Sequence, residues 1–539
     1  MGRAGALAAA AVAALLALTG ASGAATNQTP RRGGTIVVGG PLGEPACLNV
    51  LQARCGPGAL DLATNVLLPA FEYRPDLTPH PVLVSGVGYT REPPFTLTYH
   101  IRPDARWSDG VPVTSRDFVF TLNAIQRSDV EEQRVIHDVI SGIRAVDAKT
   151  VRVVLRRRYA GWRQLFPWVL PEHALRGQDL SQVWTDKIDN PTTGRPIGDG
   201  PFLVRSWDRG QQVTYVRDPR YWGPHTAYVD RLVIRFLGTP KERADGLRSG
   251  ALTVAFGLGD EFSGLRGDQR IRLDTYPGIA AEHLELRTRP GGHPALGQKL
   301  VRQALAYGID RVALVRQVYS GIVSNPSALD SMVLPLQSRY YERNFGDYRR
   351  RPAYARQLLE RAGCRLGDDA IYRCGGQRLT LRLVTTAGVP LRARALEIVQ
   401  RQLRDIGVDA QLAYVTFLVL FGSGGILDRG EFDMALFSWV FAPDPVDLGD
   451  FLGCGGSQNF SGYCQRLVTA DLDQADRILD ARQRTRVLNR AGRQIARDVP
   501  MIPLYPFILN GGNSTRLRGY VFSPNPLSNA EDWWLAPER

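Results

Sequence analysis

The sequence predicts an α/β protein of more than one domain, and three observations support this prediction. The chain has 539 residues, of which 44% are hydrophobic, and a single core stops growing beyond about 250–300 residues, so two or three domains are expected. Between residues 377 and 440, strand and helix patterns alternate with short connections, as in an α/β lobe. The contents of glycine, cysteine and charged residues are ordinary for a globular protein.

Three strands are predicted in the first 160 residues. Residues 33–39 run from a pair of glycines into a β-branched centre, and Thr150–Leu155 are rich in valine. Residues 95–101 alternate between apolar and polar side chains, which predicts a strand with one buried face.

The segment 105–120 follows the second of these strands and combines a turn with a helix start. Asp109-Gly110 predicts a tight turn, because Asp bonds to its own backbone and Gly tolerates positive φ. Thr114 followed by Asp117 is typical of a capping box, with Asp where Glu is usual. We therefore expect this segment to form a strand-to-helix corner.

From residue 301 the apolar spacing changes to that of helices. Asp310 is expected to cap the second of two helices, and Gly407 to stop a later one. The Pro-rich run 499–506 has fixed φ angles and few donors, so we expect an extended crossover there rather than a helix or a central strand. The pattern predicts, in order, two helices within 301–319, a strand at 379–383, a helix at 391–406, and strands at 408–415 and 432–440.

A secretory signal peptide is predicted for residues 1–25. Arg3 supplies a minimal positive charge, residues 4–18 are apolar, and residues 21–25 offer small side chains for cleavage. As a membrane anchor the apolar run falls short of the roughly 20 residues that span a bilayer. The first cysteine is Cys47, so no lipobox cysteine follows the run. We expect an exported protein, in the periplasm or on the outer cell surface.

The chain carries a formal net charge of +13, almost all of it from arginine. Nucleic-acid binding would need these arginines on one face with interleaved aromatic residues. They are instead scattered along the chain, which indicates a solvated, arginine-rich surface. We therefore do not expect a nucleic acid as partner.

The six cysteines fall into three local pairs, which predicts three disulfides in an exported protein. Six cysteines allow 15 connectivities, and their clustering favours the local one. Zinc is the alternative, but no pair has CxxC spacing and no histidine lies close to any pair. The predicted bridges are Cys47–Cys55, Cys364–Cys374 and Cys454–Cys464.

Six motifs occur in a fixed order along the chain. They are GGTIVVG at 33–39, WSDGVP at 107–112 with Asp117 and Phe120, GDGPFLV at 198–204 with RDPRYWG at 217–223, VRQALAYGIDR at 301–311, FDMALFSW at 432–439, and PMIPLY at 500–505. Each alone is weak. In this joint order, over nearly all of the mature chain, they resemble the family 5 (peptide/nickel-type) extracellular solute-binding proteins of ABC transporters, which include dipeptide- and oligopeptide-binding proteins.

The resemblance implies a two-lobed periplasmic-binding-protein fold of α/β class, a flytrap with an extra inserted subdomain. Ligand would bind between the lobes and favour the closed state, which would then dock on a membrane permease. The implied bounds are 33–74, 194–281 and 505–539 for the discontinuous first lobe, 75–193 for the inserted subdomain, and 282–504 for the second lobe.

The resemblance also places Trp439 at the ligand, although core packing is an alternative for this side chain. Phe441 and Asp444 lie in the Pro-rich loop that follows. In dipeptide-binding members, an Asp three residues past this Trp binds the ligand's amino group. Here that position is Ala442, and Asp444 could take its place if the loop shifts register. The carboxylate-binding Arg of those members falls near Thr386.

Neither charged clamp for a free dipeptide is therefore visible, and a buried charge without its partner is costly. We expect an oligopeptide held mainly through its backbone, rather than a free dipeptide, or a non-peptide solute. Secondary candidates for ligand contact are Glu44, Asn459 and Tyr463, each of which is equally an ordinary loop residue.

An enzyme is not expected, because the chain has no GxSxG, HExxH, P-loop or GxGxxG motif and its histidines are isolated. We expect no cofactor and no bound metal. The expected partners are a peptide or other small solute and an ABC permease, and the chain is expected to be a monomer. Binding of a nickel chelate, haem or sugar, or a role as an extracytoplasmic sensor, remain alternatives.

Overall fold

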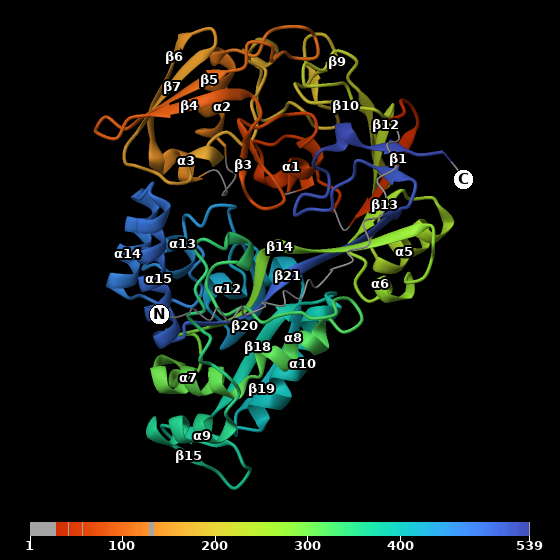
Figure 1. Cartoon of the computed structure of the whole chain (residues 1–539). Coiled ribbons are helices and arrows are strands. Elements are labelled where there is room, and N and C mark those ends of the chain that lie inside the picture. Colours follow the sequence, from red (N-terminus) through yellow and green to blue (C-terminus); the bar gives the residue numbers. More distant parts are fainter. Residues whose placement is uncertain (1–28, 41–42, 57, 129–133, 538–539) are drawn as a thin grey trace, which may run out of the picture.

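The computed structural model describes residues 29–40, 43–56, 58–128 and 134–537. These residues form two lobes, one above the other in Figure 1. We call the upper lobe residues 34–256 together with 517–535, and the lower lobe residues 294–498. The predicted signal peptide lies outside the described residues. None of the described helices combines the length and the apolar composition that a membrane crossing needs.

A ten-stranded sheet runs through both lobes. Its strands are β1 (Thr35–Gly40), β10 (Phe202–Asp208), β11 (Gln212–Arg217), β12 (Arg231–Phe236), β13 (Val254–Phe256), β14 (Ile271–Leu286), β18 (Thr380–Thr386), β19 (Asp409–Val415), β20 (Met434–Val440) and β21 (Met501–Ser514). Their order in space is β10-β11-β12-β1-β13-β21-β14-β20-β18-β19. The strands predicted in the 33–39, 379–383, 408–415 and 432–440 regions are confirmed.

The two long strands β14 and β21 connect the lobes. β21 pairs with β13 in the upper lobe, and β14 pairs with β20 in the lower lobe. β14 and β21 also pair with each other along most of their length. Their ladder shifts register between Pro277 and Ala281, where the two strands pass from one lobe to the other.

The Pro-rich run 499–506 is extended and joins the lobes, but it forms part of β21, an interior strand of the sheet. The expectation that it avoids a central strand is therefore wrong. Between Met501 and Pro506, β21 has a ladder with β14 on one edge, whereas its ladder with β13 begins only at Gly511. Prolines lack an N–H and are tolerated on such a free edge.

The upper lobe carries a second sheet, to which the predicted strands at 95–101 and 150–155 belong. It consists of β4 (Val84–Tyr89), β5 (Thr96–Ile101), β6 (Ile140–Asp147) and β7 (Thr150–Leu155), in the order β4-β5-β7-β6. Helix α2 (Ser115–Ile125) packs against β6 and β7.

The predicted corner before α2 is confirmed. The backbone N–H of Thr114 donates to Oδ2 of Asp117 at 2.6 Å, which completes the capping box. Gly110 has a φ of 95°, and the N–H of this glycine donates to the carbonyl of Trp107. Trp107 itself is buried in the upper lobe. This segment therefore forms the corner between β5 and α2 and contributes Trp107 to the core of the upper lobe.

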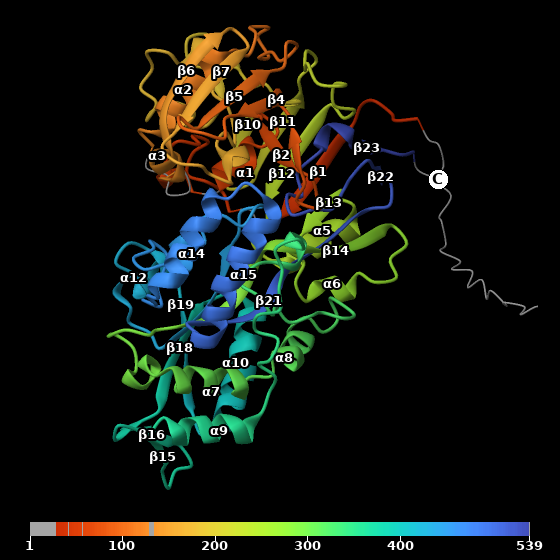
Figure 2. The same ribbon diagram turned by 60° about the vertical axis from the view of Figure 1, so that its left-hand side comes forward.

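The lower lobe covers its part of the sheet with helices. Oδ1 of Asp310 accepts the N–H of Ala313 at 2.9 Å, so the predicted cap is confirmed, and Gly407 has a φ of 78° just after α10. The longer helices are α7 (Lys299–Gly308), α8 (Arg311–Val318), α9 (Pro352–Arg361), α10 (Pro390–Arg404), α14 (Arg466–Arg477) and α15 (Ala481–Asp498). The end of the lobe that carries α9 points away from the upper lobe (Figures 1 and 2).

The remaining α-helices and strands lie in both lobes and between them. The helical ones are α1 (Gly58–Ala63), α3 (Arg134–Val139), α4 (Glu172–Leu175), α5 (Pro240–Ser249), α6 (Glu261–Gly264), α11 (Phe417–Phe421), α12 (Ile426–Arg429) and α13 (Gly449–Leu452). The strands are β2 (Phe71–Tyr73), β3 (Pro79–Pro81), β8 (Asp189–Asn190), β9 (Arg195–Pro196), β15 (Cys364–Leu366), β16 (Tyr372–Cys374), β17 (Gln377–Arg378), β22 (Leu517–Arg518) and β23 (Trp534–Leu535).

The three predicted disulfides are confirmed. Their Cα–Cα distances are 4.7 Å for Cys47–Cys55, 4.1 Å for Cys364–Cys374 and 4.4 Å for Cys454–Cys464. The second one joins β15 to β16 at paired positions of a hairpin. Each disulfide therefore fastens a local loop rather than linking distant parts of the chain.

Two large clusters of buried apolar side chains form the core. One lies mainly in the upper lobe and the other mainly in the lower lobe. Val446 and Ala442 follow β20 of the lower lobe, but they pack into or against the upper cluster. The lobes are therefore in contact just beyond the end of β20.

Candidate functional site

The edge of the lower sheet that faces the upper lobe is built by three parallel strands. β18 pairs in parallel with both β19 and β20, so their carboxyl ends at Thr386, Val415 and Val440 lie at one edge, which we call the carboxyl edge. The chain reaches β18 from β15–β17, at the end of the lobe that points away from the upper lobe (Figure 1). Open α/β sheets bind their ligands outside such an edge.

Trp439 lies at the carboxyl edge but is almost completely buried, with 3% of its surface exposed. Its ring centroid is 4.0 Å from that of His283 and 5.0 Å from that of Phe451. The indole Nε1 is buried without a hydrogen-bond partner among the described residues. Trp439 is therefore packed in the core, which is the alternative interpretation of this residue. It also has one hydrogen-bond donor, Nε1, that no described residue accepts.

Phe441 and Asp444 follow in the loop after β20. Phe441 is buried against Phe451 and donates its N–H to the carbonyl of Ile279 at 2.8 Å. The carboxylate of Asp444 accepts from the hydroxyl of Tyr340 at 3.1 Å and pairs with Arg484 at 3.4 Å. Asp444 therefore already has a cationic partner within the protein.

Thr386 belongs to a buried ion-pair network at the same edge. Nε of Arg392 donates to Oε1 of Glu282 at 3.0 Å, and a terminal nitrogen of Arg392 donates to Oγ1 of Thr386 at 2.7 Å. Ser438 donates to Oε1 of Glu282 at 2.6 Å and accepts from Arg392 at 3.1 Å. Glu282 is almost inaccessible, and Arg392 is largely covered.

The sequence analysis missed Arg392 and Glu282. Arg392 lies in the first turn of α10, so its side chain reaches back to the end of β18, six positions earlier in the chain. An arginine just after Pro390, at the start of the predicted helix, was the available signal. Glu282 is 110 residues away in sequence, and only the pairing of β14 with β20 brings it here.

The three secondary candidates make structural contacts: Asn459 and Tyr463 are hydrogen-bonded within one loop of the lower lobe, whereas Glu44 lies in the upper lobe. Oε1 of Glu44 accepts from Nε1 of Trp207 and from the N–H of Gly210 in the upper lobe. Asn459 braces the Cys454–Cys464 loop by donating to the carbonyls at positions 453 and 463. Tyr463 donates its hydroxyl to Asp498 at the end of α15.

The lobes also touch through a group of carboxylates beside α14. The hydroxyl of Tyr159 donates to Oδ2 of Asp447 at 2.6 Å, and the N–H of Asp447 donates to the carboxylate of Asp476 at 3.2 Å. Burial raises the pKa of both carboxyls, and the charge of Asp447 raises that of Asp476 further. In both views α14 lies directly under the upper lobe (Figures 1 and 2).

Four large apolar side chains are exposed around the carboxyl edge. Val440 ends β20 with 64% of its surface exposed. Helix α11 starts two residues after β19, and its Phe417 and Leu418 are 65% and 75% exposed, with Val419 about as exposed as buried. Such a group of apolar side chains on a solvent-exposed surface is typical of a contact site.

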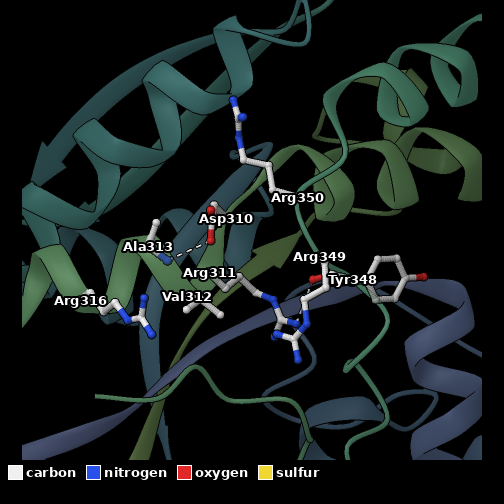
Figure 3. A pocket seen from close by; sticks show the side chains of 8 residues that line it. All are labelled: Asp310, Arg311, Val312, Ala313, Arg316, Tyr348, Arg349 and Arg350. Atoms are coloured by element: carbon white, nitrogen blue, oxygen red, sulfur yellow. Dashed lines mark hydrogen bonds between the residues drawn. The ribbon is translucent and has the colours of Figure 1, made fainter. Parts of the chain in front are cut away.

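An open pocket of about 320 Å³ lies elsewhere in the lower lobe, between α8 and the chain that leads to α9 (Figure 3). Three of its four arginines have acidic partners: Arg311 and Arg349 pair with Asp330, and Arg350 pairs with Asp405. Asp405 follows the last residue of α10, at the end of that helix opposite the carboxyl edge. We interpret this pocket as part of a stabilising arginine cluster. Within the described residues, no group of three or more His, Cys, Asp or Glu is placed to hold a metal ion.

Comparison with known proteins gives a consistent result. Residues 78–459 match the family described as bacterial extracellular solute-binding proteins, family 5 Middle. The oligopeptide-binding protein OppA of Mycobacterium tuberculosis is 28% identical over 437 residues, which cover 78% of this chain and 70% of OppA. The oligopeptide-binding protein AppA of Bacillus subtilis is 23% identical over 524 residues, which cover 94% of this chain and 92% of AppA.

Solved structures show the same two-lobed fold. AppA of Bacillus subtilis in complex with a nonapeptide superposes with a TM-score of 0.77 at 20% identity, covering 94% of this chain and all of AppA. A periplasmic EDTA-binding protein, EppA, gives a TM-score of 0.82 at 22% identity, with 95% and 98% covered. NikZ of Campylobacter jejuni in complex with Ni(L-His) gives 0.77 at 19% identity, with 93% and 99% covered.

Proposed function

The chain belongs to family 5 of the bacterial extracellular solute-binding proteins, and from this premise we propose that it captures a peptide between its two lobes and delivers it to the permease of an ABC importer. The observation that carries the proposal is the arrangement of the sheet. Among the described strands, β14 and β21 alone join its two ends, and the carboxyl edge of the lower lobe faces the upper lobe. Two bodies on such a pair of strands can close on a ligand.

A peptide is favoured by the free edge of β20. β18 pairs with β20 only at residues 434–436, so residues 437–440 have no strand partner on that side among the described strands. An extended peptide can add its own backbone to such an edge and thereby gain affinity from main-chain hydrogen bonds. This agrees with an oligopeptide held mainly through its backbone.

Import requires that the ligand shifts the lobes toward a closed state. It can do so only by binding the closed state more tightly than the open one. The contacts of Tyr159 with Asp447 and of Ala160 with Asp476 join the two lobes in this structure, and we propose that closure on the ligand preserves them. Trp439, Phe441, Asp444 and Thr386 are the lower-lobe residues that we propose at or next to the ligand.

The remaining parts of the proposal concern processing and organisation. We propose that residues 1–25 are removed on export, that the mature chain works outside the cytoplasmic membrane as a monomer, and that it catalyses no reaction. We also propose the functional division into residues 33–74, 194–281 and 505–539, the inserted subdomain 75–193, and residues 282–504. The separate upper and lower cores support two lobes, and the upper core is shared by the first lobe and the inserted subdomain.

The experiment is a ligand screen of the mature chain, residues 26–539. Thermal shift against a peptide library of two to ten residues, a sugar panel, haem and nickel with histidine tests all the alternatives together. We expect stabilisation by oligopeptides, and mass spectrometry should recover the bound peptide uncleaved. Stabilisation by the nickel chelate alone, or cleavage of the peptide, contradicts the proposal.

A further inference from the structure

We propose that the carboxyl edge selects ligands that are uncharged and apolar where they touch the lower lobe, such as a peptide with blocked ends or the interior of a longer peptide. This inference rests on the proposed function and names its substrate class. It follows from two internal ion pairs and from the apolar side chains around them.

The first ion pair already uses the cation that a carboxylate would seek. The guanidinium of Arg392 donates hydrogen bonds to Glu282, Thr386 and Ser438, at 2.7–3.2 Å. A ligand carboxylate could bind Arg392 only by displacing Glu282, a side chain with 3% exposure. Glu282 would then remain buried without a partner, which disfavours the exchange strongly.

The second ion pair, Asp444 with Arg484, already uses the carboxylate that a ligand ammonium group would bind. The loop after β20 carries two acidic side chains, Asp444 and Asp447. Asp444 is held by Arg484 and by the hydroxyl of Tyr340, and Asp447 accepts from the hydroxyl of Tyr159. Arg484 is almost fully buried and also donates to the carbonyl of Pro445. A ligand ammonium drawn to Asp444 would meet the positive charge of Arg484 directly behind it.

The surface left for the ligand is apolar. Val440, Phe417, Leu418 and Val419 expose their side chains at the ends of β20 and β19. Apolar contact stabilises the complex in proportion to the apolar surface that it buries, whereas an unpaired charge moved into the same place loses its hydration. The edge therefore favours apolar side chains and disfavours free chain ends.

The test compares three synthetic tetrapeptides with two central leucines by isothermal titration calorimetry on the mature chain. One has free ends, one is an N-acetyl acid, and one is an N-acetyl amide. We expect the N-acetyl amide to bind about ten-fold tighter than the peptide with free ends, because it leaves no unpaired charge. An N-acetyl amide with two central serines should bind more weakly than the leucine peptide.

Glu282→Gln sharpens the test, because it releases Arg392 for a ligand carboxylate. This variant should reverse the order of the N-acetyl acid and the N-acetyl amide. Asp405→Asn is the matched control: it removes the acidic partner of Arg350 at the other end of α10 and should leave the order unchanged. The comparison of the peptides on the unmodified chain stands by itself if Glu282→Gln does not fold.

The outcomes separate this inference from the proposed function. If the peptide with free ends binds as tightly as the N-acetyl amide, the inference is wrong and the proposed function stands. If the serine peptide binds as tightly as the leucine peptide, the apolar part is wrong. If none of these peptides and none of the longer library peptides binds, the proposed function itself fails.

Discussion

Tyr159 of the upper lobe donates its hydroxyl to the carboxylate of Asp447 in the lower lobe, across 2.6 Å and 288 positions of sequence. Asp447 in turn donates its N–H to the carboxylate of Asp476, whose carbonyl accepts the N–H of Ala160 at 2.7 Å. Two buried carboxyls therefore lie in the contact between the lobes. Arg157, Arg484 and Asp450 are the other charges that act on them.

This contact should weaken as the pH rises. Burial and the neighbouring carboxylate raise the pKa of Asp476 above its ordinary value, so the folded state binds this proton more tightly than the unfolded state. Its contribution is thus most favourable at acidic pH and is lost as the pH rises from the ordinary carboxyl range through the raised pKa. Asp476→Asn should reduce the loss of stability between pH 5 and pH 8, measured by urea unfolding.

Other buried carboxyls also titrate in this range, so the difference between variant and unmodified chain is the informative quantity. Asp473→Asn is the matched control on the same helix, because Asp473 is half-exposed and pairs with Arg477 on the helix surface. It should leave the pH profile of stability unchanged. Parallel pH profiles for the unmodified chain and Asp476→Asn contradict the prediction.

Most elements were predictable because their signals are local. The cap of Asp310 on Ala313 and the capping box of Thr114 with Asp117 each depend on residues three apart, and the three disulfides close short loops. The position of Pro503 within a central strand was not predictable. Which edge of β21 is free depends on where β13 ends, and β13 lies about 250 residues earlier in the chain.

The site was predictable in outline only. The motif at 432–439 located the carboxyl edge, and Thr386 and Trp439 do lie there. The charge partners were not predictable, because Glu282 reaches Arg392, and Arg484 reaches Asp444, only through tertiary packing. Counting along the sequence gave the strand end at Thr386, whereas the cation, Arg392, lies in the first turn of α10.

Trp439 is better tested by phenylalanine than by alanine. Alanine at this buried position would remove a large core side chain and cost about 3–5 kcal/mol of stability. Trp439→Phe keeps an aromatic ring against His283 but removes the unused indole N–H. If that donor serves the ligand, peptide affinity should fall by about 0.5–1.5 kcal/mol, measured by calorimetry.

Trp168→Phe provides the comparison for this variant. Trp168 is equally buried, and its Nε1 also lacks a partner among the described residues, but it lies in the upper lobe outside the proposed site. Both variants should unfold at similar urea concentrations, and only Trp439→Phe should lose affinity. Equal affinity of Trp439→Phe and the unmodified chain would remove the indole N–H from the proposed site.

The Cys454–Cys464 disulfide should affect ligand binding as well as stability. Its loop carries Ser461, whose N–H donates to Glu285 at 2.7 Å, and Glu285 holds His283 at 3.1 Å beneath Trp439. Replacing both cysteines by serine should cost about 2–3 kcal/mol of stability and weaken binding of the blocked tetrapeptide. Urea unfolding and calorimetry measure the two effects.

The Cys364–Cys374 disulfide is a close control, because it spans the same sequence separation of 10 residues. It lies in the hairpin at the end of the lower lobe that points away from the upper lobe (Figure 1). Its double serine variant should lose similar stability and keep peptide affinity. A loss of affinity in both variants would show that the effect is not transmitted through Ser461.

Asp330 should be far more sensitive to substitution than Asp405, the acidic partner of another pocket arginine. It is nearly buried and pairs with Arg311 at 2.8 Å, Arg343 at 2.9 Å and Arg349 at 3.3 Å. Arg311 is itself almost inaccessible, so Asp330→Asn leaves a buried guanidinium without its counter-charge and should cost about 3–5 kcal/mol. Asp405→Asn removes the partner of Arg350 from a more exposed pair and should cost less than about 1 kcal/mol. The free energy of unfolding of both variants is measured in urea. Equal losses of stability would mean that the carbonyls around Arg311, including those of Leu329 and Pro503, compensate its charge without Asp330.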